Sequence, residues 1–222
     1  MITGDFLWLI LSHLTVVFPI YIGLKENIRR WLPVCITLFF TSIFSSIYHW
    51  VDQDNFDLKS FEFLGNSHEV YANMDFFCSY LSIFLTVFYT INPLQKPRHL
   101  DISLIIIVLI SAFVSFIVCT WYAFTLIVTG FSLFYLVKSK DFKGKDIISN
   151  IKKNIILTLF ATGFLITGIV MQYYFAIYQD PYYYRVYHGF WHFFMFLSSG
   201  LWIVWNEKFR QIENIKILCI PV

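Results

Sequence analysis

Long stretches without a charged residue constrain this chain more than any other feature of its sequence. The longest, 102–137, runs for 36 residues without Lys, Arg, Asp or Glu. As one α-helix it would measure ~54 Å, nearly twice the bilayer core of about 30 Å. Charged residues are 14% of the chain and hydrophobic ones 58%, whereas soluble domains carry about 25% charged residues. The sequence therefore predicts an all-α, polytopic membrane protein rather than a soluble domain, a disordered chain or a disulfide-bonded scaffold.

The apolar stretches give the number of membrane-spanning helices. A span needs about 20 consecutive apolar residues. We expect 102–137 to fold back near Cys119–Trp121, which gives a bundle of seven transmembrane helices; a continuous helix there would give six. The six stretches are Phe6–Leu24, Trp31–Val51, Val70–Ile91, Ile102–Val137, Ile155–Tyr178 and Val186–Trp205.

The distribution of Lys and Arg favours seven spans. Seven spans place 14 of the 16 basic residues on one side and two on the other, whereas six spans divide them six against ten. Because basic loops stay in the cytoplasm, the N-terminus is predicted outside and the C-terminus inside. Positive charge follows the first stretch instead of preceding it, so we expect an uncleaved first helix. The expected division is a seven-helix domain over 1–205 and a cytoplasmic tail over 206–222. A net charge of +2 is too small to indicate a nucleic-acid partner.

Polar and ionisable residues inside the spans are the candidate functional residues, because such groups are costly in lipid. Ser45 and His49 end the second predicted helix, Asp75 begins the third, and His188 and His192 begin the last. The predicted topology brings all of these positions to the outer face of the membrane. Three separated segments of the sequence would thus place polar groups at one level of the bundle.

The spacing of these residues suits a metal ion. His188 and His192 are four residues apart, so both imidazoles lie on one helical face, as do Ser45 and His49. Three neutral imidazoles and a water form a known catalytic zinc site. Asp75 could hold that water or orient a histidine. Ser45 could do likewise or donate to a developing oxyanion.

Two alternatives to a metal site stay open at this point. The histidines could form a hydrogen-bonded core cluster, with Asp75 and His49 as a buried polar pair. His13, alone in the first predicted helix, is expected to be satisfied by a neighbouring helix and is not assigned to the site.

Three motifs in order resemble those of the CREST superfamily of seven-helix membrane proteins, which holds alkaline ceramidases and adiponectin and progestin receptors. The run of tyrosines in Asp180–Tyr184, before the last two histidines, and the Asp52–Gln53 pair, after His49, are most similar to the transmembrane-protein-8 branch, which includes myomaker. The motifs are S-x-x-Y-H-x-x-D-Q at Ser45–Gln53, D-F-x-x-S at Asp75–Ser79, and D-x-Y-Y-Y at Asp180–Tyr184 followed by H-x-x-W-H at His188–His192.

The resemblance implies a zinc ion held by His49, His188 and His192, with Ser45 and Asp75 beside it. It further implies a plasma-membrane protein that promotes cell–cell fusion, such as the fusion of myoblasts. Membrane lipids would be its partners, and a small fusogenic partner protein and a homodimer are left open, as is a location in Golgi or endoplasmic reticulum membranes.

A second interpretation is a zinc-dependent hydrolase of lipid amides or esters, similar to the alkaline ceramidases. In it Asp75 is the catalytic base for a water that zinc activates, and Ser45 stabilises the oxyanion. A receptor similar to the adiponectin receptors ranks last, because those receptors have the opposite orientation in the membrane. The sequence does not separate the fusion and hydrolase interpretations.

Overall fold

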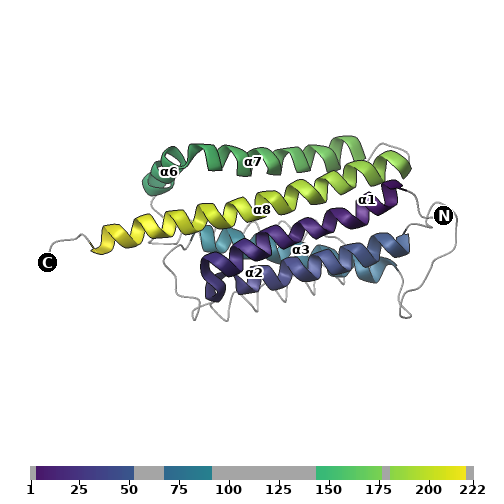
Figure 1. Ribbon diagram of the computed structural model, residues 1–222, viewed down its shortest axis with the longest axis horizontal. Coiled ribbons are helices and arrows are strands. Elements are labelled where there is room, and N and C mark those ends of the chain that lie inside the picture. Colours follow the sequence, from purple (N-terminus) through teal and green to yellow (C-terminus); the bar gives the residue numbers. More distant parts are fainter. Residues whose placement is uncertain (1–3, 53–67, 92–143, 177–180, 219–222) are drawn as a thin grey trace.

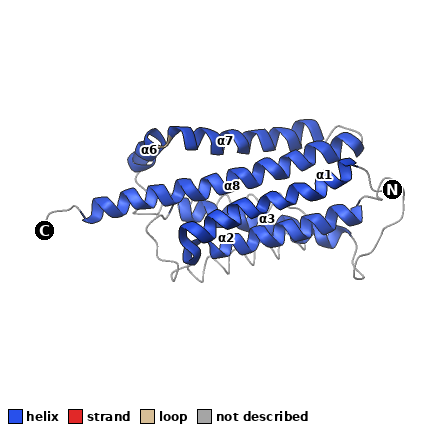
Figure 2. Cartoon of the chain, viewed as in Figure 1, coloured by secondary structure: helices blue, strands red, loops and turns tan. Residues whose placement is uncertain are grey.

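The computed structural model describes residues 4–52, 68–91, 144–176 and 181–218, and every one of these lies in a helix except the turn at Asn154 (Figures 1 and 2). The predicted all-α class is confirmed for these ranges. The 102–137 run and its expected reversal, which decide between seven and six spans, lie outside the described residues. In chain order the helices are α1 (Gly4–Ser12), the 3₁₀ turn η1 (His13–Val16), α2 (Val17–Asp52), α3 (His68–Ile91), α6 (Gly144–Lys153), α7 (Ile155–Val170), the π-helical turn η3 (Met171–Ala176) and α8 (Pro181–Leu218).

The first two predicted helices form a hairpin that bends within α2. Asn27 has φ −162° and ψ 86°, which breaks the helical backbone there. The chain then folds back, since Cys35 Sγ lies 3.8 Å from the Ile20 carbonyl oxygen. At the far end of the hairpin, Phe6 and Trp50 pack with ring centroids 5.4 Å apart. The two arms are therefore antiparallel, and each rises about 34 Å at 1.5 Å per residue.

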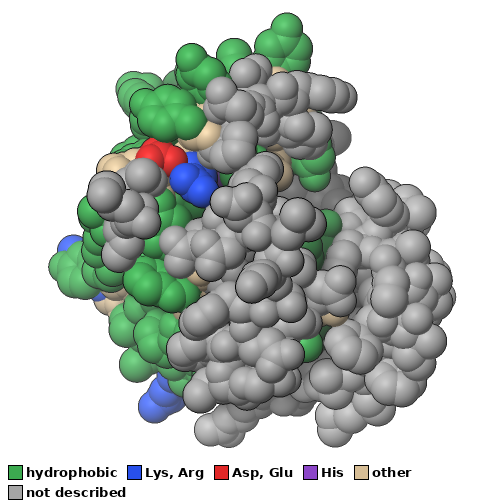
Figure 3. Space-filling view, turned by 90° about the vertical axis from the view of Figure 1, so that its right-hand side faces the viewer, with side chains coloured by type: hydrophobic (Ala, Val, Ile, Leu, Met, Phe, Trp, Pro, Cys, Tyr) green, Lys and Arg blue, Asp and Glu red, His purple; other side chains and the backbone are tan. Residues whose placement is uncertain are grey.

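The outer surface of the bundle is apolar. Two helical segments among the described residues are long and apolar enough to cross a membrane: Gly4–Trp50, which includes the bend at Asn27, and Ile155–Phe175. Hydrophobic side chains cover much of the described surface in the end view of Figure 3. Contiguous exposed apolar surface of this kind is uncommon on soluble monomers. Large apolar side chains that are at least 40% exposed along the two arms include Leu7, Leu11, Leu14, Val17, Tyr21, Leu32, Ile36, Phe39 and Phe40.

Helix α8 lies at the centre of the described bundle and contacts α1, α2, α3 and α7 (Figure 1). Two glycines let the first arm approach it closely. A Cβ on Gly189 would lie 2.5 Å from Trp8 Nε1, and one on Gly200 would lie 2.4 Å from Phe18 Cε1. Small residues at helix interfaces permit such close backbone approach in membranes. This packing sets the position of η1 against the first half of α8.

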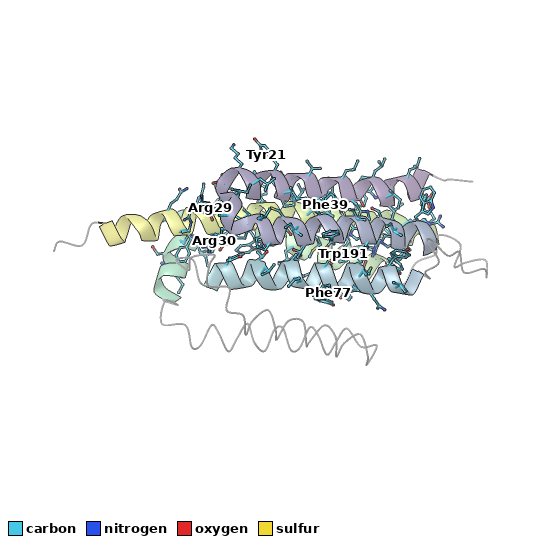
Figure 4. The ribbon with its side chains drawn as sticks, turned by 90° about the horizontal axis from the view of Figure 1, so that it is seen from below. Tyr21, Arg29, Arg30, Phe39, Phe77 and Trp191 are labelled. Carbon is cyan, nitrogen blue, oxygen red and sulfur yellow. The ribbon has the colours of Figure 1, made fainter. Side chains whose placement is uncertain are left out.

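A buried ionic cluster joins α2, α3 and α8 at the end of the bundle where the hairpin turns. Glu207 is 1% exposed. It accepts a 2.8 Å hydrogen bond from Trp31 Nε1 and forms an ion pair with Arg210 Nη2 at 2.7 Å. Arg30 Nε lies 3.7 Å from the same carboxylate, and Arg30 Nη2 donates to the Tyr89 carbonyl at 2.6 Å. Figure 4 shows Arg30 at the hairpin turn. We call these five residues the Glu207 cluster.

The last helix continues past the predicted start of the cytoplasmic tail. We placed the end of the domain at Trp205, but α8 runs without a break to Leu218. Glu207 and Phe209 are buried, so this part of the predicted tail packs within the bundle. The mixed charge after Trp205 gives no sign of these contacts, because two of the groups that meet Glu207, Trp31 and Arg30, are distant in sequence.

The lysine-rich segment Gly144–Lys153 forms a helix, α6, that the sequence does not predict. Helix α6 lies across the end of α7 (Figure 1). Its apolar residues Ile147, Ile148 and Ile151 recur at helical spacing. Two lysines in its last turn are favoured there by the helix dipole. A dense run of lysines was therefore compatible with a short amphipathic helix.

Candidate metal centre

Four histidines meet near the end of the bundle where α1, α3 and α8 begin and α2 ends (Figure 1). His13 comes from η1, His49 from α2, and His188 and His192 from successive turns of α8. None of the four is more than 5% exposed. The structure thus brings together the three histidines that we predicted as zinc ligands and adds His13 to them.

The ring nitrogens of the predicted ligands point toward one another. His49 Nε2 lies 3.0 Å from His188 Nε2 and 3.3 Å from His192 Nε2. Two nitrogens bound at about 2.05 Å to a tetrahedral zinc lie about 3.3 Å apart. The observed separations therefore match the edges of a tetrahedral zinc site.

A second triad includes the histidine that the sequence analysis left out. His13, His49 and His192 each present a ligand atom, and these three atoms all lie within 4.8 Å of one another. The His13 ring centroid is 4.0 Å from that of His192. The expectation that a neighbouring helix satisfies His13 is wrong, because its Nδ1 is bonded to the carbonyl of Leu9 on its own helix. The one feature of the sequence that could have added His13 to the predicted ligands is its position in the outer half of the first predicted span.

Gln172 fixes the orientation of His188. His188 Nδ1 donates to Gln172 Oε1 at 2.5 Å, which leaves the Nε2 lone pair of His188 facing His49. Ligating histidines usually donate their other ring N–H to an acceptor in this way. Gln172 lies in the π-helical turn η3, and such turns occur frequently at functional sites. The sequence does not predict a role for Gln172, because a single polar residue in an apolar stretch does not indicate a π-turn.

Ser45 lies beside the histidines, and Asp75 is connected to them through Ser45. Ser45 is fully buried, and its Oγ is 3.5 Å from His192 Nε2. Ser79 Oγ donates to Asp75 Oδ1 at 3.3 Å, and Asp75 is also hydrogen-bonded to Ser45. A polar path therefore leads from the carboxylate on α3, through a hydroxyl on α2, to a histidine on α8.

Aromatic rings surround the histidines. Tyr184 stacks on His188 with centroids 4.9 Å apart and an interplanar angle of 23°. Trp191, which Figure 4 shows among the helices, lies 4.9 Å from His188 and 4.6 Å from His192. Such a wall excludes water and lowers the local dielectric, which strengthens electrostatic interactions inside it.

The donor set fits a zinc ion better than it fits a hydrogen-bonded cluster. His188 and His13 both use Nδ1 as a donor, so in the neutral imidazoles their Nε2 atoms are acceptors only. His49 Nε2 could donate to one of its two histidine neighbours, but His13 Nε2 has no hydrogen-bond partner among the described residues. A cation that accepts several lone pairs satisfies all of these atoms together. Imidazole nitrogen is a preferred ligand of zinc.

A family described as "Protein of unknown function (DUF3522)" matches residues 2–193, which is most of the chain. The chain therefore belongs to this family. No curated protein matches it.

Proposed function

We propose that this chain, as a member of the DUF3522 family, is a multi-pass plasma-membrane protein that promotes cell–cell fusion and holds a zinc ion on buried histidines. The observation that carries the proposal is that His49 Nε2 lies 3.0 Å from His188 Nε2 and 3.3 Å from His192 Nε2. That arrangement is the one that the resemblance to the fusion-promoting branch implies. The fusion activity itself rests on the resemblance.

In this proposal zinc has a structural role. Bound by histidines of α2 and α8, it would join the two helices near one face of the membrane, while the Glu207 cluster joins them near the other. Asp75 would link α3 to the same site through Ser45. Since metal-binding free energy is also folding free energy, the ion would hold the bundle in a single arrangement during contact between two membranes.

The basic residues of the chain support one direction in the membrane. Arg30 and Arg210 lie in the Glu207 cluster, at the end of the bundle opposite the histidines. Basic residues favour the cytoplasmic side. This supports an orientation with the histidines toward the outer leaflet, the leaflet that first merges when two cells fuse.

One observation favours a hydrolase as the second candidate. Ser45 lies 3.5 Å from His192 and is hydrogen-bonded to Asp75, and a water and a lipid carbonyl could be placed beside these groups. Asp75 would take the proton of the attacking water and return it to the leaving amine or alcohol, and Ser45 Oγ–H would donate to the oxyanion. Zinc, when bound, supplies Lewis-acid chemistry to such a reaction.

A cell-mixing assay separates the two functions. Two fusion-poor cell populations with different cytoplasmic labels would each express the chain, alone or with a small fusogenic partner. We expect doubly labelled cells with the wild type and with the control Leu159→Ala, whose side chain is 64% exposed on α7. We expect few with His49→Ala.

The purified protein is then tested for turnover of ceramides and other lipid amides, which we expect to be negligible. Strong hydrolysis that Asp75→Ala abolishes, together with an absence of mixed cells, would reverse the order of the two candidates.

A further inference from the structure

We infer that His13 is a fourth ligand of the zinc ion and closes the centre to water and lipid carbonyls. The inference rests on the proposed zinc centre and concerns what that centre can do. Three imidazoles leave a tetrahedral zinc with an open position, whereas four protein ligands give a closed, structural site. The identity of the fourth ligand therefore decides whether the zinc site can be catalytic or is structural.

The His13 ring is buried against the rings of His192 and His49. It is 2% exposed, and its centroid lies 4.0 Å from that of His192 and 5.8 Å from that of His49. Its ligand atom is within 4.8 Å of those of His49 and His192. His13 thus belongs to one group of close ligand atoms with His49 and His192, and His188 joins this group through His49 Nε2.

Backbone carbonyls fix the protonation of the ring. His13 Nδ1 lies 3.0 Å from the Leu9 carbonyl and 3.2 Å from that of Ile10. Because carbonyls only accept hydrogen bonds, Nδ1 carries the proton and Nε2 carries the lone pair. That Nε2 is buried without a hydrogen-bond partner among the described residues. A buried acceptor left unsatisfied destabilises the fold, and a bound cation removes this cost.

The local backbone fixes the orientation of the ring. The helix tightens into the 3₁₀ turn η1 at His13, and a 3₁₀ stretch inside a helix often marks a functional hinge or a strained sequence. The Leu9 carbonyl accepts from Ser12 Oγ at 2.6 Å as well as from His13 Nδ1. These bonds hold the ring in one orientation, with Nε2 directed away from its own helix.

The position of His13 also blocks a route from the lipid. An apolar groove of about 780 Å³ lies between the two arms of the hairpin and is lined by His13, Ser42 and Ile43. Leu14 and Val17, on its rim, are more than 60% exposed. His13 borders both this groove and the histidine cluster. An acyl-linked carbonyl entering from the groove would meet an imidazole that is already bound to the metal.

X-ray absorption at the zinc edge of the purified full chain tests the inference without reference to activity. Imidazole rings give a characteristic outer-shell signal that can be counted. We expect four imidazoles in the wild type and three with one oxygen ligand in His13→Gln. The control Leu7→Ala, whose side chain on α1 is 47% exposed, should keep four.

Cobalt substitution provides a second measurement. Azide should leave the visible spectrum of the cobalt-loaded wild type unchanged and should shift that of His13→Gln, where a position has opened. If His13→Gln does not fold, the wild-type imidazole count and its response to azide still decide the question.

Three imidazoles in the wild type, with azide binding, would overturn this inference and leave the zinc centre intact. A wild-type protein without zinc would overturn both. Four imidazoles in a chain that fails to promote fusion would overturn only the fusion proposal.

Discussion

Removing the Glu207 carboxylate should destabilise the protein more than any surface change of the same size. Glu207 is 1% exposed and accepts from Trp31 and Arg210, with Arg30 3.7 Å away. Glu207→Ala would leave Arg30, which is 3% exposed, without its carboxylate. Removing one partner of a buried ion pair costs about 3–5 kcal/mol.

The expected change in melting temperature follows from this free energy. For a chain of 222 residues, 1 kcal/mol corresponds to about 2–4 °C. Glu207→Ala should therefore lower the melting temperature in detergent by about 6–20 °C. Glu207→Gln, which keeps an oxygen acceptor for Trp31 but loses the charge, should lie between Glu207→Ala and the wild type.

Lys208→Ala is the matched control, because Lys208 is the next residue and is exposed. Exposed substitutions usually change stability by less than about 0.5 kcal/mol, so its melting temperature should stay within about 2 °C of the wild type. If Glu207→Ala behaves like Lys208→Ala, the Glu207 cluster does not hold α2 and α8 together and our reasoning about it fails.

Gly200→Ala should lower the yield and the melting temperature, because the new Cβ would lie 2.4 Å from Phe18. The control Gly163→Ala, whose new Cβ meets nothing within 4 Å, should leave both unchanged. Equal effects of the two substitutions would refute the close packing of the first arm on α8. Gln172→Ala should weaken zinc binding by about 10–100-fold in a chelator competition, because His188 loses its acceptor, and unchanged affinity would show that Gln172 does not orient the ring. An N-terminal epitope tag should be stained on intact cells and a C-terminal tag only after permeabilisation, and the reverse pattern would contradict the predicted orientation.

The parts of the site that follow from helical periodicity could be predicted from the sequence. The i, i+4 spacing places His188 and His192 on one face of α8, and the direction of the predicted spans brings His49 to the same level. The helical class followed from the long apolar stretches, which need helices to satisfy their backbone in lipid.

The remaining parts depend on contacts that periodicity does not encode. The presence of His13 in the histidine cluster depends on the position of the first arm along α8. That position is set by the packing of Gly189 and Gly200 against aromatic rings of the first arm. Gln172 reaches His188 only because the π-turn η3 changes the helical register. Neither the contact between two helices nor a single π-turn leaves a repeating pattern in the sequence.

The zinc content of the full chain, purified without chelators, tests the central claim most directly. Elemental analysis should give about one zinc per chain, with zinc–nitrogen distances of roughly 2.0–2.1 Å. His188→Ala should lower both the zinc content and the melting temperature, since the energy of metal binding contributes to folding. A wild-type protein that contains no zinc, and whose melting temperature added zinc does not raise, would contradict the account and leave only a hydrogen-bonded histidine cluster.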